Sequence, residues 1–141
     1  MSNSQNKKLV VKSTTDNLIK IRDFIKDSAA SSGLKEDAIG KIILAVDEAC
    51  TNIIKHAYKY SVDGEINVAV KSDKLKFTIQ ITDSGNHFDP ENIPEPDIQK
   101  YHKQKKGGGL GMFLMKKLMD EVSYKNLTNN RNQVTLIKYI S

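Results

Sequence analysis

The sequence has 141 residues, of which 38% are hydrophobic and 28% charged, a composition typical of one folded domain with an ordinary core. Its net charge of +5 would suit nucleic acid, but two arginines and no tryptophan argue against that class, and we expect no direct nucleic-acid binding. No secretory leader and no run of roughly 20 apolar residues is apparent, so we expect a cytoplasmic protein without a membrane segment. Cys50, the single cysteine, lies in an apolar helical pattern and is interpreted as a buried thiol.

The first part of the chain is predicted to hold one strand and two helices. Residues 8–12 form a short apolar strand, and the hydroxyl and carboxyl side chains of residues 13–16 can cap the helix that follows. That helix ends near residues 31–33. A second helix is expected from about residue 35 towards residue 60, because apolar residues recur there at helical spacing.

The second part is predicted to hold four strands and one helix. Alternating patterns indicate strands at 65–71 and 75–82, a helix is expected at 110–120, and a closing hairpin is expected at 122–127 and 133–140. The stretch 84–109 fits neither period and contains all three prolines, and a loop of this length indicates either an active-site lid or a disordered linker.

This order of elements predicts the fold class. Strands that follow one another through tight turns favour an antiparallel or mixed sheet with helices packed on one side. We therefore expect an α+β protein, a two-layer sandwich with a mixed, largely antiparallel sheet and helices on one face. No internal repeat is visible, and we expect a single domain over residues 1–141.

Three polar residues follow one another at one-turn spacing on the second predicted helix. Glu48, Asn52 and His56 form a ridge beside the apolar stripe when the residues are placed at 100° intervals. Asparagine is a poor residue inside a helix, and its amide oxygen suits Mg²⁺. A carboxylate one turn away could accept a proton from an attacking hydroxyl. The alternative is that the ridge is only the wet side of an amphipathic helix.

A glycine-rich stretch opens the third predicted helix. Gly107 to Gly111 contains four glycines, whose backbone N–H groups can approach phosphate oxygens at a helix N-terminus. Lys105 and Lys106 add positive charge immediately before it, which favours a polyanionic small ligand. Asp83 ends a strand before a glycine turn and could accept a hydrogen bond from an exocyclic amine. The alternatives are a flexible hinge for the glycines and an ordinary turn for the aspartate.

These three elements, in this order, resemble the GHKL (Bergerat-type) ATPase and kinase fold. Residues 46–58 are similar to its N-box, residues 83–85 to its first glycine box and residues 109–111 to its second. The match is closest to the small bacterial anti-sigma factors that are also serine-protein kinases, through residues 48–58, 85–89 and 108–122.

The resemblance implies that residues 1–141 are one ATP-binding kinase domain, with ATP and Mg²⁺ as cofactors and a lid made of residues 86–107. It also gives each matching residue a role. Glu48 would be the catalytic base, Asn52 the Mg²⁺ ligand, and Asp83 the residue that binds the adenine amine, with Gly85 giving it room. The residues implied to bind the nucleotide are Asn52, Lys55, Asp83, Gly85, Lys106, Gly108, Gly109, Leu110 and Gly111.

The resemblance also implies partners. The chain would phosphorylate a serine or threonine of an anti-anti-sigma (STAS) protein and would then be free to bind a sigma factor. It would also form a homodimer, for which apolar residues of the first helix and strand offer a face. Two positions depart from the family pattern. Gly107 stands where some members have an arginine, and Gln133 precedes Val134 where the wider fold often has a threonine.

Two other functions remain open from the residues. One is a binding module that uses ATP to order its lid without transferring phosphate, although Glu48 favours an enzyme. The other is a stand-alone histidine-kinase-type ATPase domain. The latter needs a phospho-accepting histidine on an N-terminal helix pair, and the three histidines are at positions 56, 87 and 102.

Overall fold

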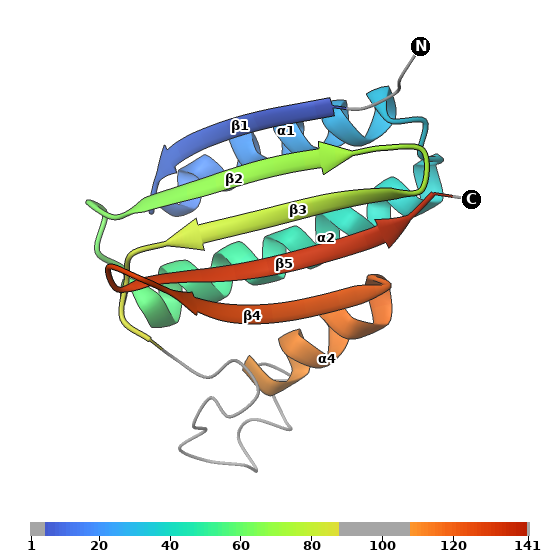
Figure 1. Cartoon of the computed structure of the whole chain (residues 1–141). Coiled ribbons are helices and arrows are strands. Elements are labelled where there is room, and N and C mark those ends of the chain that lie inside the picture. Colours follow the sequence, from blue (N-terminus) through green and yellow to red (C-terminus); the bar gives the residue numbers. More distant parts are fainter. Residues whose placement is uncertain (1–4, 88–107, 141) are drawn as a thin grey trace.

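The computed structural model of the chain describes residues 5–87 and 108–140 (Figure 1). The first half contains β1 (Gln5–Lys12), the 3-10 turn η1 (Thr15–Asn17), α1 (Leu18–Ser31), α2 (Glu36–Asn52) and the π-helix η2 (Ile53–Ala57). The second half contains β2 (Glu65–Ser72), β3 (Lys76–Asp83), α4 (Gly108–Leu118), β4 (Glu121–Leu127) and β5 (Arg131–Tyr139). Every predicted helix and strand is present. The predicted lid lies outside the described residues except for Asn86 and His87.

The five strands form one sheet in the order β1-β2-β3-β5-β4. All four neighbouring pairs are antiparallel, which confirms the largely antiparallel sheet and leaves no parallel pair among the described strands. Strands β3 and β4 do run in the same direction, but β5 returns between them and pairs with both. The hairpin from β4 to β5 turns through Asn129 and Asn130, whose φ angles of 64° and 57° are left-handed values that asparagine tolerates.

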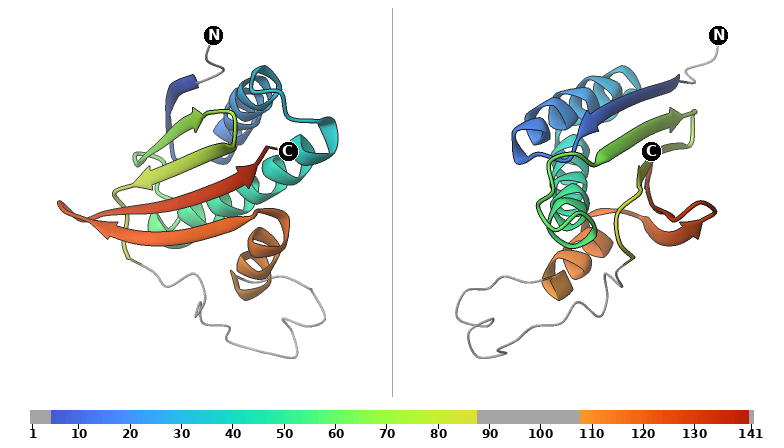
Figure 2. Two further views of the ribbon diagram at one scale, coloured as in Figure 1. Left: turned by 45° about the vertical axis from the view of Figure 1, so that its right-hand side comes forward. Right: turned by 90° about the vertical axis from the view of Figure 1, so that its left-hand side faces the viewer.

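Helices α1, α2 and α4 cover one face of the sheet, and none of the described elements covers the other face (Figure 2). Alternation along each strand explains this arrangement, because successive side chains point to opposite faces. In β2 the buried residues are Ile66, Val68, Val70 and Ser72. These side chains meet α1 and α2 in a single core that includes Cys50, so the buried thiol is confirmed. No described helix is long and apolar enough to cross a membrane.

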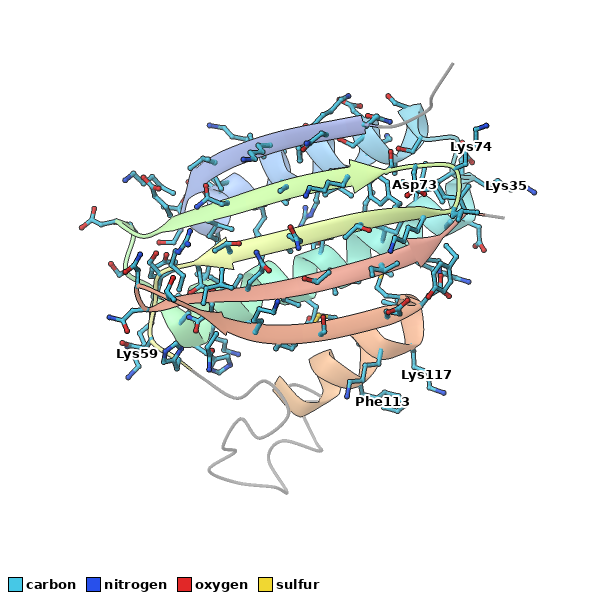
Figure 3. All side chains as sticks on the ribbon, in the orientation of Figure 1. Lys35, Lys59, Asp73, Lys74, Phe113 and Lys117 are labelled. Atoms are coloured by element: carbon cyan, nitrogen blue, oxygen red, sulfur yellow. The ribbon has the colours of Figure 1, made fainter. Side chains whose placement is uncertain are left out.

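Helix α4 packs against α2, and only some of its apolar side chains are buried. Met115 and Met119 are buried in the core, whereas Phe113 and Leu114 are 55% and 49% exposed. The ammonium group of Lys117 lies 5.4 Å from the centre of the Phe113 ring, and both side chains point away from the sheet (Figure 3). The two methionines therefore form the core side of α4, and Phe113 and Leu114 stay at the surface.

Candidate functional site

The N-box residues lie on the last turns of α2 and on η2. Glu48 is half-buried, Asn52 is only 3% exposed, and Lys55 is exposed. The alternative, that the ridge is only the wet side of an amphipathic helix, is therefore wrong for Asn52, which is buried. Helix α4 packs against α2, and the helix changes to π-helical geometry directly after Asn52.

The Glu48 carboxyl group is less acidic than an ordinary glutamate. Burial raises its pKa, the positive charge of Lys55 lowers it, and the negative charge of Asp47 raises it. Lys55, two turns further along, is thus close enough to Glu48 to act on its charge. Asp47 is itself engaged from α1, because the Arg22 Nε lies 2.9 and 2.8 Å from its two carboxylate oxygens. A carboxyl group whose pKa is raised towards neutrality is better suited to accept a proton.

The Asn52 amide is buried without being fully paired. Its Nδ2 atom has no hydrogen-bond partner among the described residues. An unpaired buried amide is costly, and such groups in proteins usually have a ligand, an ion or a water to satisfy them. The described residues contain no group of three or more histidine, cysteine, aspartate or glutamate side chains that could hold a metal by themselves. The Asn52 amide also carries an oxygen, the kind of ligand that Mg²⁺ takes together with phosphates and water, while its unpaired Nδ2 can donate to a phosphate oxygen.

The carboxylate of Asp83 is held at the end of β3. It is 3% exposed, and its Oδ1 accepts hydrogen bonds from the Gly85 N–H at 2.9 Å and from the Asn132 Nδ2 at 2.9 Å. Burial raises the pKa of Asp83, and these two donors lower it. Asn132 also donates to the Gly85 carbonyl at 3.2 Å and accepts from His87, so it ties the turn after β3 to strand β5.

Gly85 allows the turn after Asp83 to touch the end of the N-box helix. A Cβ atom at this position would lie 2.6 Å from the backbone carbon and oxygen of Ala57, a distance that real Cβ atoms do not show. The Asn86 N–H donates to the Ala57 carbonyl at 2.7 Å. Sequence reasoning gave Gly85 the role of making room for a ligand. That role stays a prediction, and the structure shows that Gly85 makes room for η2.

A small pocket lies between α2, Asp83 and the β4–β5 hairpin. Its volume is about 40 Å³, well below the roughly 300–1,000 Å³ of typical small-molecule sites, so its walls must move apart to admit a purine. Ala49 and Ile53 form its α2 side. Its remaining lining residues are Asp83, Tyr124, Lys125, Asn126, Asn132, Gln133 and Val134.

Asn132 is a site residue that the sequence reasoning missed. The family pattern singles out Gln133, the residue before Val134, but the Gln133 amide donates to the Thr82 hydroxyl at 3.1 Å and not to Asp83. Because side chains alternate along a strand, the residue that shares a face with buried Val134 is Asn132. The alternation was the available signal.

The glycine loop is only partly described. Helix α4 begins at Gly108, two residues earlier than expected, so Gly108 to Gly111 form its first turn. This placement keeps the glycines at a helix N-terminus, where their N–H groups have no partner within the helix. Lys106 lies outside the described residues, and so does Gly107.

A larger hollow of about 470 Å³ lies on the open face of the sheet. It is lined by strand residues that include Lys8, Lys71 and Arg131. None of the predicted site residues lines it. Size alone therefore does not identify the site, and the chemistry of the side chains points to the helix-covered face.

Residues 11–138 match the family model of the histidine kinase-like ATPase domain. The chain therefore belongs to this family. It is 36% identical over 117 residues to the serine-protein kinase RsbW of Listeria monocytogenes serovar 1/2a, with 80% of this chain and 73% of the relative covered. It is 32% identical over 126 residues to the serine-protein kinase RsbW of Bacillus subtilis strain 168, with 86% of this chain and 77% of the relative covered.

Two solved structures share the fold. The structure of the RsbU and RsbW domains of Rv1364c from Mycobacterium tuberculosis superposes with a TM-score of 0.65 at 16% identity, and the match covers 95% of this chain and 31% of that chain. The SiaB–SiaC complex from Pseudomonas aeruginosa gives a TM-score of 0.58 at 16% identity, and the match covers 94% of this chain and 89% of that chain. These neighbours support the GHKL-like α+β architecture expected from the motifs.

Proposed function

We propose that the chain is a protein-serine/threonine kinase that transfers the γ-phosphate of ATP to a STAS partner and acts as a cytoplasmic anti-sigma regulator of transcription. The observation that carries the proposal is the pair formed by Glu48 and Asn52. A carboxylate of raised pKa and a buried, incompletely paired amide lie one turn apart on the same helix. The serine-protein kinases with 32–36% identity over most of the chain support the same activity.

ATP would bind between α2, the turn after β3 and the start of α4. Asp83 would accept a hydrogen bond from the adenine amine, in a position already fixed by Gly85 and Asn132. The phosphates would meet the N–H groups of the first turn of α4, which runs from Gly108 through Gly109 and Leu110 to Gly111. Lys55 and Lys106 would add positive charge.

The Asn52 amide would supply the protein ligand for Mg²⁺. The metal would contact the amide oxygen, and the buried Nδ2, which has no partner among the described residues, would donate to a phosphate oxygen or a water. When bound, Mg²⁺ neutralises negative charge on the phosphates. The remaining ligands would be phosphate oxygens and water.

Glu48 would act on the hydroxyl group of the partner's serine or threonine. The hydroxyl oxygen forms a bond to the γ-phosphorus, the bond from that phosphorus to the ADP oxygen breaks, and the hydroxyl proton passes to the Glu48 carboxylate. The raised pKa of Glu48 makes its carboxylate a stronger proton acceptor than an ordinary glutamate. The products are ADP and a phosphorylated partner.

Phosphorylation would switch the partner. A phosphate adds about −1.5 to −2 charges at neutral pH, enough to break an interface that contains acidic groups. The released kinase would then be free to bind a sigma factor. We further propose a homodimer, supported by the exposed apolar side chains of Val10 on β1 and Ile19 on α1, which are 53% and 61% exposed.

The deciding experiment is phosphate transfer from Mg-[γ-³²P]ATP to a candidate STAS protein. We expect label on the partner with the unaltered chain and none with Glu48→Gln, while both bind ATP. Bound ATP with no label in either sample would contradict the kinase and leave the non-catalytic ATP-dependent binding module. Label on the kinase's own histidine, which is acid-labile, would instead support a histidine-kinase-type activity.

A further inference from the structure

Tyr58 makes two hydrogen bonds at the point where strands β2 and β3 separate. Its hydroxyl donates to the Glu65 carbonyl at 2.6 Å and accepts from the Ser84 N–H at 2.8 Å. The last paired residues of the two strands are Ile66 and Asp83, so Glu65 and Ser84 would be the next pair in this register. The tyrosine oxygen thus takes the place of a direct bond between the strands.

The position of the Tyr58 ring is fixed by close packing. A Cβ atom at Gly64 would lie 2.4–2.5 Å from three atoms of the ring, so the ring lies directly on the backbone of a glycine that leaves it space. Burial raises the pKa of Tyr58, which keeps its hydroxyl protonated and able to donate at neutral pH. Its own backbone N–H closes the π-helix by donating to the Ile53 carbonyl at 2.9 Å.

The turn from Asp83 to Asn86 is therefore held from the end of the N-box helix at three adjacent places. Ser84 donates to the Tyr58 hydroxyl, Gly85 packs on the Ala57 backbone, and Asn86 donates to the Ala57 carbonyl. Ser84 is the residue next to Asp83, so the tyrosine hydroxyl sets where the chain leaves the sheet immediately after the buried carboxylate.

We infer that Tyr58 is a positioning residue for purine recognition: by spacing Ser84 from Glu65, its hydroxyl orients the turn that presents Asp83 to the base. The inference rests on the proposed binding of ATP. It assigns Tyr58 no contact with the nucleotide and no part in phosphate transfer. Its action is through Asp83, which distinguishes an amine from a carbonyl oxygen at position 6 of the purine.

The test compares ATP with inosine triphosphate, which has a carbonyl oxygen in place of the amine. In calorimetric titrations with Mg²⁺ we expect the unaltered chain to prefer ATP. We expect Tyr58→Phe to reduce that preference by about tenfold or more, because the Ser84 N–H loses its acceptor and the turn its anchor. The matched control is Tyr60→Phe, which removes a hydroxyl from a side chain that is 62% exposed two residues away and should leave the preference unchanged.

A second variant changes the position of the Tyr58 ring without removing its hydroxyl. Gly64→Ala displaces the Tyr58 ring and should lower the ATP preference in the same way. This variant decides the question if Tyr58→Phe does not fold. Equal weakening of ATP and inosine triphosphate would show a general structural role and overturn the inference, as would an unchanged preference. No binding of either nucleotide by the unaltered chain would overturn the proposed function itself.

Discussion

The side chain of Asn132 donates a 2.9 Å hydrogen bond to the carboxylate of Asp83, which joins the start of β5 to the end of β3. The two residues are 49 positions apart in the sequence. Together with the Gly85 N–H, this contact fixes Oδ1 of a carboxylate that is almost fully buried. The site therefore keeps a costly buried acid in one orientation, which is an arrangement expected for ligand recognition.

Replacing Asp83 by asparagine should separate binding from stability. Asparagine retains an oxygen that can accept hydrogen bonds from Gly85 and Asn132. It removes the charged carboxylate, which would accept the hydrogen bond from the adenine amine. A hydrogen bond to a charged group contributes about 1.5–3 kcal/mol, so we expect ATP to bind roughly 10- to 100-fold more weakly. Isothermal titration calorimetry measures this loss. An unchanged affinity would show that Asp83 does not contact the base.

The same variant should be at least as stable as the parent at neutral pH. Burial raises the pKa of Asp83 above its ordinary value of 3.8, so the folded state holds this proton more tightly than the unfolded chain. This tighter proton binding stabilises the folded state fully at a pH below the ordinary pKa of Asp83, and the stabilisation is lost as the pH rises through the pKa of Asp83 in the folded state. Urea unfolding of both proteins at pH 7 tests the sign. A clear loss of stability in Asp83→Asn would contradict it.

Glu48 should give a pH dependence of the same sign. Its pKa is raised from the ordinary 4.5 by burial, so the unfolded chain loses this proton first and the free energy of unfolding falls as pH rises through the folded pKa. Glu48→Gln should flatten that part of the curve. Phosphate transfer should show the opposite trend and rise with pH over the same interval, because only the ionised carboxylate accepts a proton. Parallel rate and stability curves would exclude this role.

Asn52→Ala should abolish the Mg²⁺-dependent part of ATP binding. The cost to stability should be small, about 1 kcal/mol or less, since the Nδ2 that is removed has no partner. Titrations of ATP with and without Mg²⁺ measure the first effect and urea unfolding the second. If Mg²⁺ strengthened ATP binding equally in the variant and the parent, the amide would not be the metal ligand.

Gly85→Ala tests the contact between the turn and the N-box helix. The new methyl group would meet the Ala57 backbone at 2.6 Å, so we expect the free energy of unfolding to fall by about 1–3 kcal/mol and ATP to bind more weakly. The control is Gly40→Ala in α2, where a Cβ atom has no neighbour within 4 Å. This control should stabilise the helix by roughly 0.5–1 kcal/mol. Equal stabilities for the two variants would show that the turn can move away from η2.

The order and type of the elements could be predicted because each depends on a local period. The burial of Asn52 could not, since a wheel at 100° per residue assumes that α2 stays regular and that nothing packs on its second side. The π-helix and α4 break both assumptions. The contacts of Tyr58 with Ser84 and of Asn132 with Asp83 join residues 26 and 49 apart, and no local pattern records such pairs.

Strands β1 and β4 are the two edges of the sheet, and an edge with free N–H and C=O groups can recruit a strand from another molecule. Strand β1 has lysines at positions 7, 8 and 12, all exposed. Their charges repel one another when two such edges approach, which opposes the growth of a continuous sheet from chain to chain. We therefore expect the β1 edge to resist strand-by-strand aggregation at high concentration.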